Sequence, residues 1–396
     1  MFLNYLMAIL GLCSIFVVAY VMSTDRKKIR YFPILRMFIL QVILAFILLK
    51  TSSGTALVES LSSGFTELLD DANEGVNFVF KGIANKGSAP FFLTVLMPIV
   101  FISALIGILR YIKILPLFMK YVGLGLQKIN GMGKLESYNG IASAVLGQSE
   151  VFITLKKELA FLSERRMMTF GISTMSTISL SIMGSYMRLI KPEYVITAVV
   201  LNLFGGFIIS SIVNPYELDP SEKDELETKE DSEHTFFQML GEYMLDGFKV
   251  AVTVAAMLIG FVALIAFINS LFLHLIGISF QQLLGYVFAP LAFLTGIPWD
   301  QAVDAGSLMA TKLATNEFVA MTQLTTQNWH FSERSLAIIS VFLVSFANFS
   351  SIGVLSGAVK GLNEEKSNLI AKHGLKILGS ATLVSFLSSI IVGLII

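Results

Sequence analysis

The feature of this sequence that most limits its fold is a series of long apolar runs without a single charged residue. The clear cases are residues 2–22, 87–109, 167–187, 194–216, 335–359 and 377–396. A helix needs roughly 20 apolar residues to cross the hydrocarbon layer of a bilayer. Only helices and closed barrels satisfy their backbone hydrogen bonds in that layer. Each of these runs therefore predicts a transmembrane helix.

Two more spans are expected where the pattern is less clean. Residues 31–49 are interrupted only by Arg36, which lies close enough to one end to extend its charge to the interface. Residues 250–299 carry no charge except a possible one on His274, and they are too long for one span. Asn269 and the break at 277–282 predict a crossing at about 247–274 and then a short helix at 280–294. We expect an all-α integral membrane protein with about eight transmembrane helices.

The overall composition agrees with a bilayer as the main solvent. Hydrophobic residues make up 55% of the chain and charged residues 14%, whereas an average soluble domain is about a quarter charged. Lys plus Arg equals Asp plus Glu at 28 each, so no net charge suggests a nucleic-acid partner or an acidic substrate. The one cysteine, Cys13, excludes internal disulfides and a thiolate metal cage, and we expect it to be a small buried apolar residue.

The positions of Lys and Arg predict the orientation, because cytoplasmic loops are enriched in both. The basic loop at 25–30 is expected in the cytoplasm, which places the N-terminus outside. Lys156, Lys157, Arg165 and Arg166 then fall on the same side, while Arg188 and Lys191 are exceptions on the outer side. An even number of spans returns the C-terminus to the outside.

Two segments are expected to lie outside the hydrocarbon layer. Residues 219–233 carry eight acidic residues against two lysines, so a solvated cytoplasmic linker is expected within 217–246. Residues 56–86 place apolar residues at helical spacing among five acidic residues, which predicts an amphipathic helix lying in the outer interface.

A long-range similarity between two halves organises the rest of the chain. After one span come a short helix (111–130), a polar-interrupted segment (137–164) and two spans; the same order returns with 280–294, about 299–329 and the last two spans. An odd number of crossings in each unit makes this an inverted repeat, which is common in secondary transporters. The predicted divisions are 1–86, repeat 1 at 87–216, the linker at 217–246 and repeat 2 at 247–396.

The polar-interrupted segments predict two re-entrant helical hairpins. Residues 137–149 are too short to span before the chain reaches Glu150, and 305–315, which include Lys312, lead to Glu317 in the same way. A charge at mid-membrane costs about 2.5–3.5 kcal/mol, so both glutamates should face a polar cavity or a shared substrate. The alternative is that both segments are surface loops with solvated acids, which their apolar flanks rich in Gly, Ala and Ser disfavour.

Two spans that follow the hairpins contain polar runs. Residues 176–181 hold four hydroxyl side chains, and residues 345–353 hold Asn348 beside Ser351. Unwound helices in transporters expose backbone groups that bind ions and substrate. Ser and Thr also let helices pack closely, which leaves the first run open to either reading. In the second run, Asn348 favours a binding site.

Three motifs resemble those of the concentrative nucleoside transporter family, in the order and at the intervals found there. They are residues 147–150 (GQSE), 316–320 (NEFVA) and 345–353 (SFANFSSIG). The whole chain is similar to the short, eight-span bacterial members. The resemblance implies a homotrimer in the bacterial inner membrane that imports nucleosides, with pyrimidine nucleosides such as uridine expected, by cation-coupled symport with alternating access. It implies no cofactor other than the coupling cation.

The resemblance also implies which residues bind substrate. The nucleobase would be recognised from the first hairpin and helix by Gln148, Ser149, Glu150 and Ile182. The ribose would be held from the second hairpin and helix by Glu317, Phe346, Asn348 and Ser351. These residue types suit the ligand, because a carboxylate accepts hydrogen bonds from sugar hydroxyls while an amide, a hydroxyl and an acid offer both donors and acceptors to a base.

The coupling ion is expected next to the first hairpin. In sodium-coupled relatives the matching positions are those of Ser143, Leu146, Thr177 and Ile178. Ser143 stands where those relatives have Asn, so the resemblance favours the proton-coupled branch, with Glu150 or Glu317 as the proton carrier. Sodium at the same four positions is the alternative.

Two other classes of protein fit less well. An intramembrane enzyme would need a catalytic motif, yet the chain has neither a His-Glu-x-x-His nor a Gly-x-Ser-x-Gly sequence, and its four histidines are widely separated. A channel would need a filter, and nothing here resembles a symmetric ring.

Overall fold

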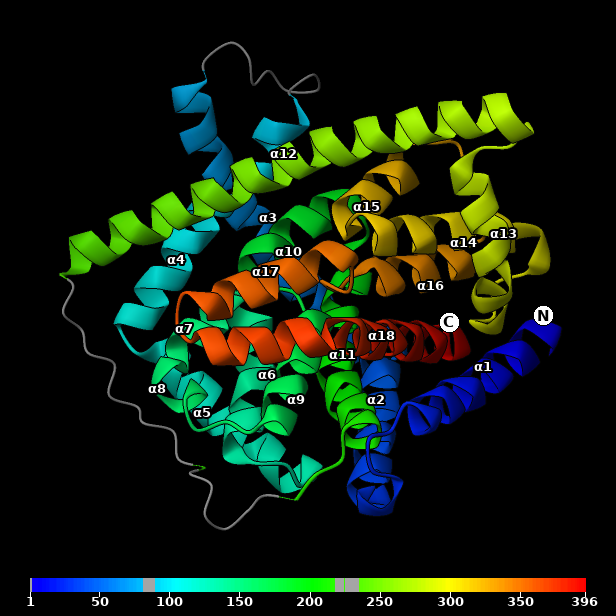
Figure 1. The fold of residues 1–396 in the computed structure, drawn as a ribbon. Helices are drawn as coiled ribbons and strands as arrows, with labels where there is room; N and C mark the ends of the chain where they lie inside the picture. Colours follow the sequence, from blue (N-terminus) through cyan, green and yellow to red (C-terminus); the bar gives the residue numbers. More distant parts are fainter. Residues whose placement is uncertain (1, 81–89, 218–223, 225–234) are drawn as a thin grey trace.

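The computed structural model describes residues 2–80, 90–217, 224 and 235–396, and all regular secondary structure in these residues is helical (Figure 1). Among the described residues, seven helices are long and apolar enough to cross a membrane, or eight if the bent pair Phe280–Leu294 and Trp299–Ala314 forms one span. The predicted all-α membrane fold is therefore confirmed.

The first three helices follow one another with short connections. α1 (Phe2–Val21) and α2 (Tyr31–Lys50) match the first two predicted spans to within a few residues. The expected burial of Cys13 on α1 is wrong, because its side chain is exposed. α3 (Ser52–Val79) begins directly after Thr51, whose hydroxyl accepts a hydrogen bond from the Gly54 N–H. α3 is amphipathic, since Val58, Leu69 and Val76 are buried while its acidic side is open. The remaining residues of this predicted helix, 81–86, lie outside the described part of the chain.

The first half continues with a span, a short helix and a hairpin. The π-helix Phe92–Leu96 and α4 (Ile99–Tyr111) form the third span, and α5 (Ile114–Asn130) follows. Hairpin 1 consists of α6 (Lys134–Leu146), α7 (Glu150–Thr154) and α8 (Lys156–Leu159). The next predicted span is broken into α9 (Glu164–Ser176) and α10 (Leu180–Leu189), and α11 (Pro192–Val213) ends this half.

One side chain that the charge count assigned to a cytoplasmic loop is buried instead. Arg166 lies in the first turn of α9 with no exposed surface, and its Nε is 2.5 Å from the Glu136 Oε1 on α6. This ion pair joins hairpin 1 to the broken helix.

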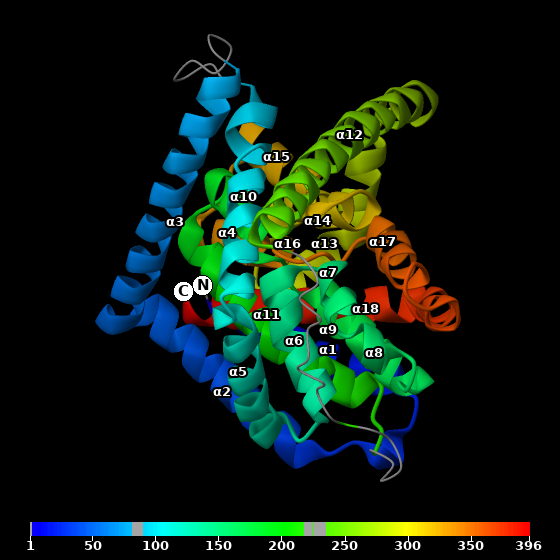
Figure 2. The same ribbon diagram turned by 90° about the vertical axis from the view of Figure 1, so that its left-hand side faces the viewer.

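The helix that opens the second half differs from the prediction. α12 (Phe236–Ile276) has 41 residues and begins well before the predicted crossing at 247–274, so the end of the expected linker is helical. The start is set by Thr235, whose hydroxyl accepts from the Gln238 N–H while the Gln238 side chain caps the Thr235 N–H. At 1.5 Å per residue the helix is about 60 Å long, and it crosses the molecule obliquely (Figures 1 and 2). Apart from Asp224, residues 218–234 lie outside the described part.

The second half then repeats the order of the first. α13 (Phe280–Leu294) meets α14 (Trp299–Ala314) at an angle of 115°. α14 and α15 (Glu317–Thr326) form hairpin 2, and α16 (Glu333–Leu343) and α17 (Phe349–Lys360) form the second broken helix. α18 (Glu364–Ile395) starts earlier than the predicted 377, because Asn363 caps a polar extension of the span.

The two helix breaks lie against each other at the centre of the molecule. The backbone N–H of Phe346 in the second break donates to the Thr177 carbonyl in the first, at 3.2 Å. α18 packs on both broken helices, beside α11 (Figure 1). The fold thus brings together two hairpin tips and two breaks that are far apart in sequence.

Candidate functional site

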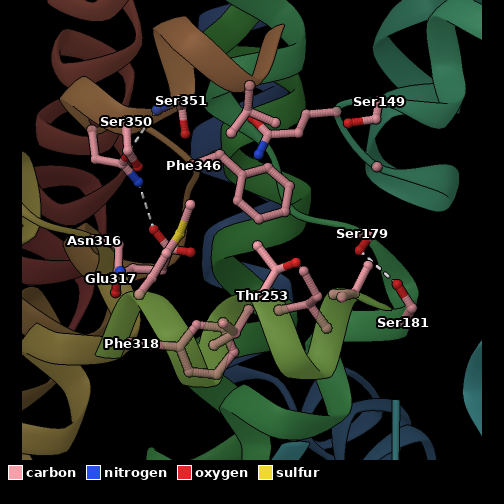
Figure 3. A pocket seen from close by; sticks show the side chains of 18 of the residues that line it. Ser149, Ser179, Ser181, Thr253, Asn316, Glu317, Phe318, Phe346, Ser350 and Ser351 are labelled. Atoms are coloured by element: carbon pink, nitrogen blue, oxygen red, sulfur yellow. Dashed lines mark hydrogen bonds between the residues drawn. The ribbon is translucent and has the colours of Figure 1, made fainter. Parts of the chain in front are cut away.

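A cavity of about 290 Å³ lies between the two hairpin tips, the two helix breaks and α12 (Figure 3). Its size is close to the lower end of small-molecule sites, which are roughly 300–1,000 Å³. Every residue that the sequence proposed for substrate binding lines this cavity: Gln148, Ser149, Glu150, Ile182, Glu317, Phe346, Asn348 and Ser351.

The tip of hairpin 1 turns at Gly147. Its φ of 106° lies in the region that side chains with a Cβ avoid, and a Cβ here would be 3.0 Å from the Ser179 Cβ in the first break. The following residues, Gln148 to Glu150, are half-buried. The Gln148 Oε1 is buried and has no hydrogen-bond partner within the described residues. A buried acceptor left unpaired costs about 1–3 kcal/mol, so this oxygen is suited to a donor brought by a ligand.

The tip of hairpin 2 is fixed by its own hydrogen bonds. Asn316 caps α15, because its Oδ1 accepts from the Val319 N–H at 3.0 Å. Glu317, only 4% exposed, accepts from the Tyr186 hydroxyl at 2.7 Å through Oε1 and from the Asn348 Nδ2 at 3.0 Å through Oε2. The carboxylate is therefore held as an acceptor at one end of the cavity.

The second break presents polar groups around an aromatic ring. The Asn348 Oδ1 accepts from the Ser351 N–H at 2.9 Å and from the Ser350 hydroxyl at 2.7 Å, which starts α17. Phe346 projects between the Glu317 end and the Ser149 end of the cavity (Figure 3). A flat ring between two polar ends suits a ligand that has both an apolar face and hydroxyl groups.

One wall of the cavity comes from α12, which the sequence reasoning missed. The lining positions are Lys249, Val250, Thr253, Val254 and Met257. Their spacing from 250 is that of one helical face, which is the signal that could have found them. This spacing could not be recognised in the sequence, because residues on every face of this helix are apolar. Tyr186 was also missed as a partner of Glu317.

The four residues predicted to hold the coupling ion lie on two adjacent elements, with Ser143 and Leu146 in the last turn of α6 and Thr177 and Ile178 in the first break. Leu146 lines the cavity, while Ser143, Thr177 and Ile178 are buried. The Ser143 Oγ is 2.9 Å from the Thr174 Oγ1, and the Ser143 hydroxyl also lies 2.7 Å from the Asn139 carbonyl. In the described residues no group of three or more His, Cys, Asp or Glu side chains could hold a metal ion. An ion at this position would therefore depend on hydroxyl and backbone oxygens.

Comparison with known families covers nearly the whole chain. Residues 10–83 match the profile described as "Na+ dependent nucleoside transporter N-terminus", and residues 194–393 match the corresponding C-terminus. Residues 92–193, which contain hairpin 1 and the first broken helix, match a profile described as "Nucleoside recognition".

Individual relatives agree along their full lengths. The purine nucleoside transport protein NupG of Bacillus subtilis (strain 168) is 35% identical over 98% of this chain and 99% of its own. The nucleoside permease NupC of Helicobacter pylori is 31% identical over 100% of this chain and 99% of its own. A solved structure of CNTnw in an inward-facing substrate-bound state is 29% identical, with a TM-score of 0.93 over 98% of both chains. An outward-facing variant of CNTnw is 28% identical, also with a TM-score of 0.93, over 99% of this chain and 97% of its own.

Proposed function

Since this chain belongs to the concentrative nucleoside transporter family, we propose that it imports nucleosides by cation-coupled symport with alternating access. It is a multi-pass membrane transporter and not an enzyme. The observation that carries the proposal is the placement of Glu317, which Tyr186 and Asn348 fix inside the cavity. The other end of the cavity holds the Gln148 Oε1, which has no hydrogen-bond partner within the described residues.

The two ends of the cavity would bind different parts of a nucleoside. At one end, Glu317, Asn348 and Ser351 offer acceptors and donors to vicinal ribose hydroxyls, and Phe346 packs on the sugar. At the other end, Gln148, Ser149 and Glu150 face the nucleobase, with Ile182 against its ring. A ligand without the hydroxyls would leave buried polar groups unpaired, at about 1–3 kcal/mol each.

We propose protons as the coupling ion. Ser143 stands where the sodium-coupled members that this chain resembles have Asn, and its hydroxyl already hydrogen-bonds to Thr174 and to the Asn139 carbonyl. Glu150 is half-buried and lines the cavity, which favours it over Glu317 as the proton carrier, because both Glu317 oxygens already accept hydrogen bonds. One charge moving through 100 mV supplies about 2.3 kcal/mol, or about 50-fold accumulation. Sodium at Ser143, Leu146, Thr177 and Ile178 is the second candidate, supported by the description of the family profiles.

For the substrate we propose pyrimidine nucleosides such as uridine. The alternative is a purine nucleoside, because the Bacillus subtilis relative is named for purines. Competition of unlabelled nucleosides with labelled uridine distinguishes the two. Inhibition by cytidine but not by inosine supports the first, and the reverse order supports the second.

We also propose a homotrimer in the bacterial inner membrane with both termini outside. The exposed face of α12 supports an apolar neighbour, since Ile259 and Phe267 are 74% and 65% exposed. Cross-linking in native membranes tests the oligomeric state. A homotrimer should give a cross-linked trimer band, and a monomer band alone would contradict it.

The proposed transport is tested with the purified protein in liposomes. An imposed inward proton gradient in sodium-free buffer should accumulate labelled nucleoside above its external concentration. Strict dependence on sodium would replace protons by the second candidate. Mere equilibration of the nucleoside across the membrane would instead indicate a channel and contradict symport.

A further inference from the structure

Lys312 is a buried lysine that does not line the cavity of the proposed substrate site. It lies on α14, two residues before the helix ends at Ala314, and has no exposed surface. It belongs to the same hairpin as Glu317, whose two oxygens accept hydrogen bonds from Tyr186 and Asn348 and not from the Lys312 Nζ. Because a buried ammonium is costly unless it is hydrogen-bonded, the groups around Lys312 indicate its role.

The ammonium of Lys312 is surrounded by oxygen atoms. Its Nζ donates to the Phe342 carbonyl at 2.6 Å, to the Ser345 Oγ at 2.7 Å and to the Ser385 Oγ at 3.2 Å. The Nζ also lies 4.6 Å from the centre of the Phe342 ring. The two hydroxyls can donate onward, Ser345 to Ser385 and Ser385 to the Ala381 carbonyl. All three N–H donors of a protonated amine therefore have acceptors.

The helix break is what makes the Phe342 carbonyl available. In a continuous helix this carbonyl would accept from the N–H four residues later, which belongs to Phe346. That N–H instead donates to the Thr177 carbonyl in the other break, and Lys312 takes its place. The ammonium thus lies at the negative C-terminal end of α16, where a cation is favoured.

The same place in the first repeat has no such charge. There the last turn of α6 meets the last turn of α9, and the groups that meet are the hydroxyls of Ser143 and Thr174. Half-helix C-termini and unwound carbonyls are the groups that coordinate coupling cations in transporters. The two repeats therefore differ at their corresponding helix ends, because hydroxyl groups meet in the first repeat and a lysine side chain lies there in the second.

We infer that the Lys312 ammonium is a built-in cation of the second repeat. It holds the Phe342–Asn348 break in the conformation that binds substrate, without an ion from solution. This inference rests on the proposed nucleoside transport. Lys312 is a positioning residue, because it acts through Phe342 and Ser345 on Phe346 and Asn348, which line the cavity. Only the first repeat is then left to respond to a dissolved cation.

Two matched variants test this inference in liposomes, with wild-type uptake as the test of transport itself. Lys312→Ala removes the charge and leaves space, while Lys312→Met removes the charge and keeps most of the volume. We expect both to lose about ten-fold or more of nucleoside uptake, because hydrogen bonds to a charged group are lost. Adding methylammonium should restore Lys312→Ala several-fold and leave Lys312→Met unchanged, since only the first has room for it.

Two results overturn the inference while leaving wild-type transport intact. One is wild-type uptake by Lys312→Met, which would show that the charge is dispensable. The other is a loss in Lys312→Ala that methylammonium does not change. If Lys312→Ala is not recovered from membranes, its recovery is measured after growth and solubilisation with methylammonium. Recovery that rises supports a built-in cation, and recovery that does not rise contradicts it.

Discussion

The two hairpin tips have the same order of helices but opposite characters. At hairpin 1 the chain turns through Gly147, the tip residues are half-buried, and the Gln148 oxygen has no partner within the described residues. At hairpin 2 Asn316 caps the next helix, Glu317 is fixed by two hydrogen bonds, and Lys312 lies behind it. This difference suggests that the two tips bind different parts of the substrate. The tip of hairpin 2 would be the preorganised end, which binds the ribose, and the tip of hairpin 1 the adaptable end, which binds the base and the ion.

The largest expected effect is at the preorganised end. Glu317→Gln replaces an acceptor of two hydrogen bonds with a group that must also donate, so uptake should fall about 100-fold, in line with the roughly 1.5–3 kcal/mol of a charged hydrogen bond. Initial rates of labelled nucleoside uptake measure it, with membrane insertion checked on the same vesicles. Uptake at the wild-type rate would remove Glu317 from the site.

The matching change at the adaptable end should affect coupling more than binding. The Glu150→Gln side chain can neither take up nor release a proton, so the roughly 50-fold accumulation expected from one charge at 100 mV should disappear. Exchange of labelled for unlabelled nucleoside across the membrane should continue, because the amide still bonds to a base. Accumulation that persists under a proton gradient would show that Glu150 is not the carrier.

Preorganisation of Glu317 is tested without changing the carboxylate. Tyr186→Phe removes the donor to Glu317 Oε1, and KM should rise about ten-fold at the cost of one charge-assisted hydrogen bond. Tyr286→Phe is the control, since Tyr286 is 59% exposed on α13. An unchanged KM for Tyr186→Phe would mean that Asn348 alone fixes the carboxylate.

The smallest effect is expected at the wall that belongs to neither hairpin. Thr253→Val on α12 keeps the shape of the side chain and removes one hydroxyl from the cavity, so KM should rise about two- to three-fold. Competition by nucleosides measures it. A loss as large as that of Glu317→Gln would move the main binding contacts from the hairpins to α12.

The spans, both hairpins and both breaks could be predicted because each is a local pattern. Apolar length identifies a span, and a charge or a hydroxyl run inside it identifies a turn or a break, as at Glu150 and Ser345. The starts of α12 at Phe236 and α18 at Glu364 could not be predicted in this way. Both helices extend from the apolar run into polar sequence, where hydropathy gives no signal.

The part of the site that could not be predicted from the sequence depends on contacts between segments that are distant in the sequence. Lys312 interrupts an apolar hairpin in the sequence, and nothing nearby explains it, because its acceptors are 30, 33 and 73 residues away. Tyr186 and Glu317 are 131 residues apart. The resemblance of short motifs could place residues in the cavity, but only the three-dimensional structure pairs them.

The central claim is that one nucleoside lies between the two hairpin tips, with its sugar at the preorganised end. A structure determined with 5-iodouridine tests this most directly, because the iodine marks the base in an anomalous difference map. We predict an iodine peak inside the cavity beside Gln148 and Glu150, with the ribose hydroxyls on Glu317 and Asn348. An iodine peak beside Glu317, or outside the cavity, would contradict it.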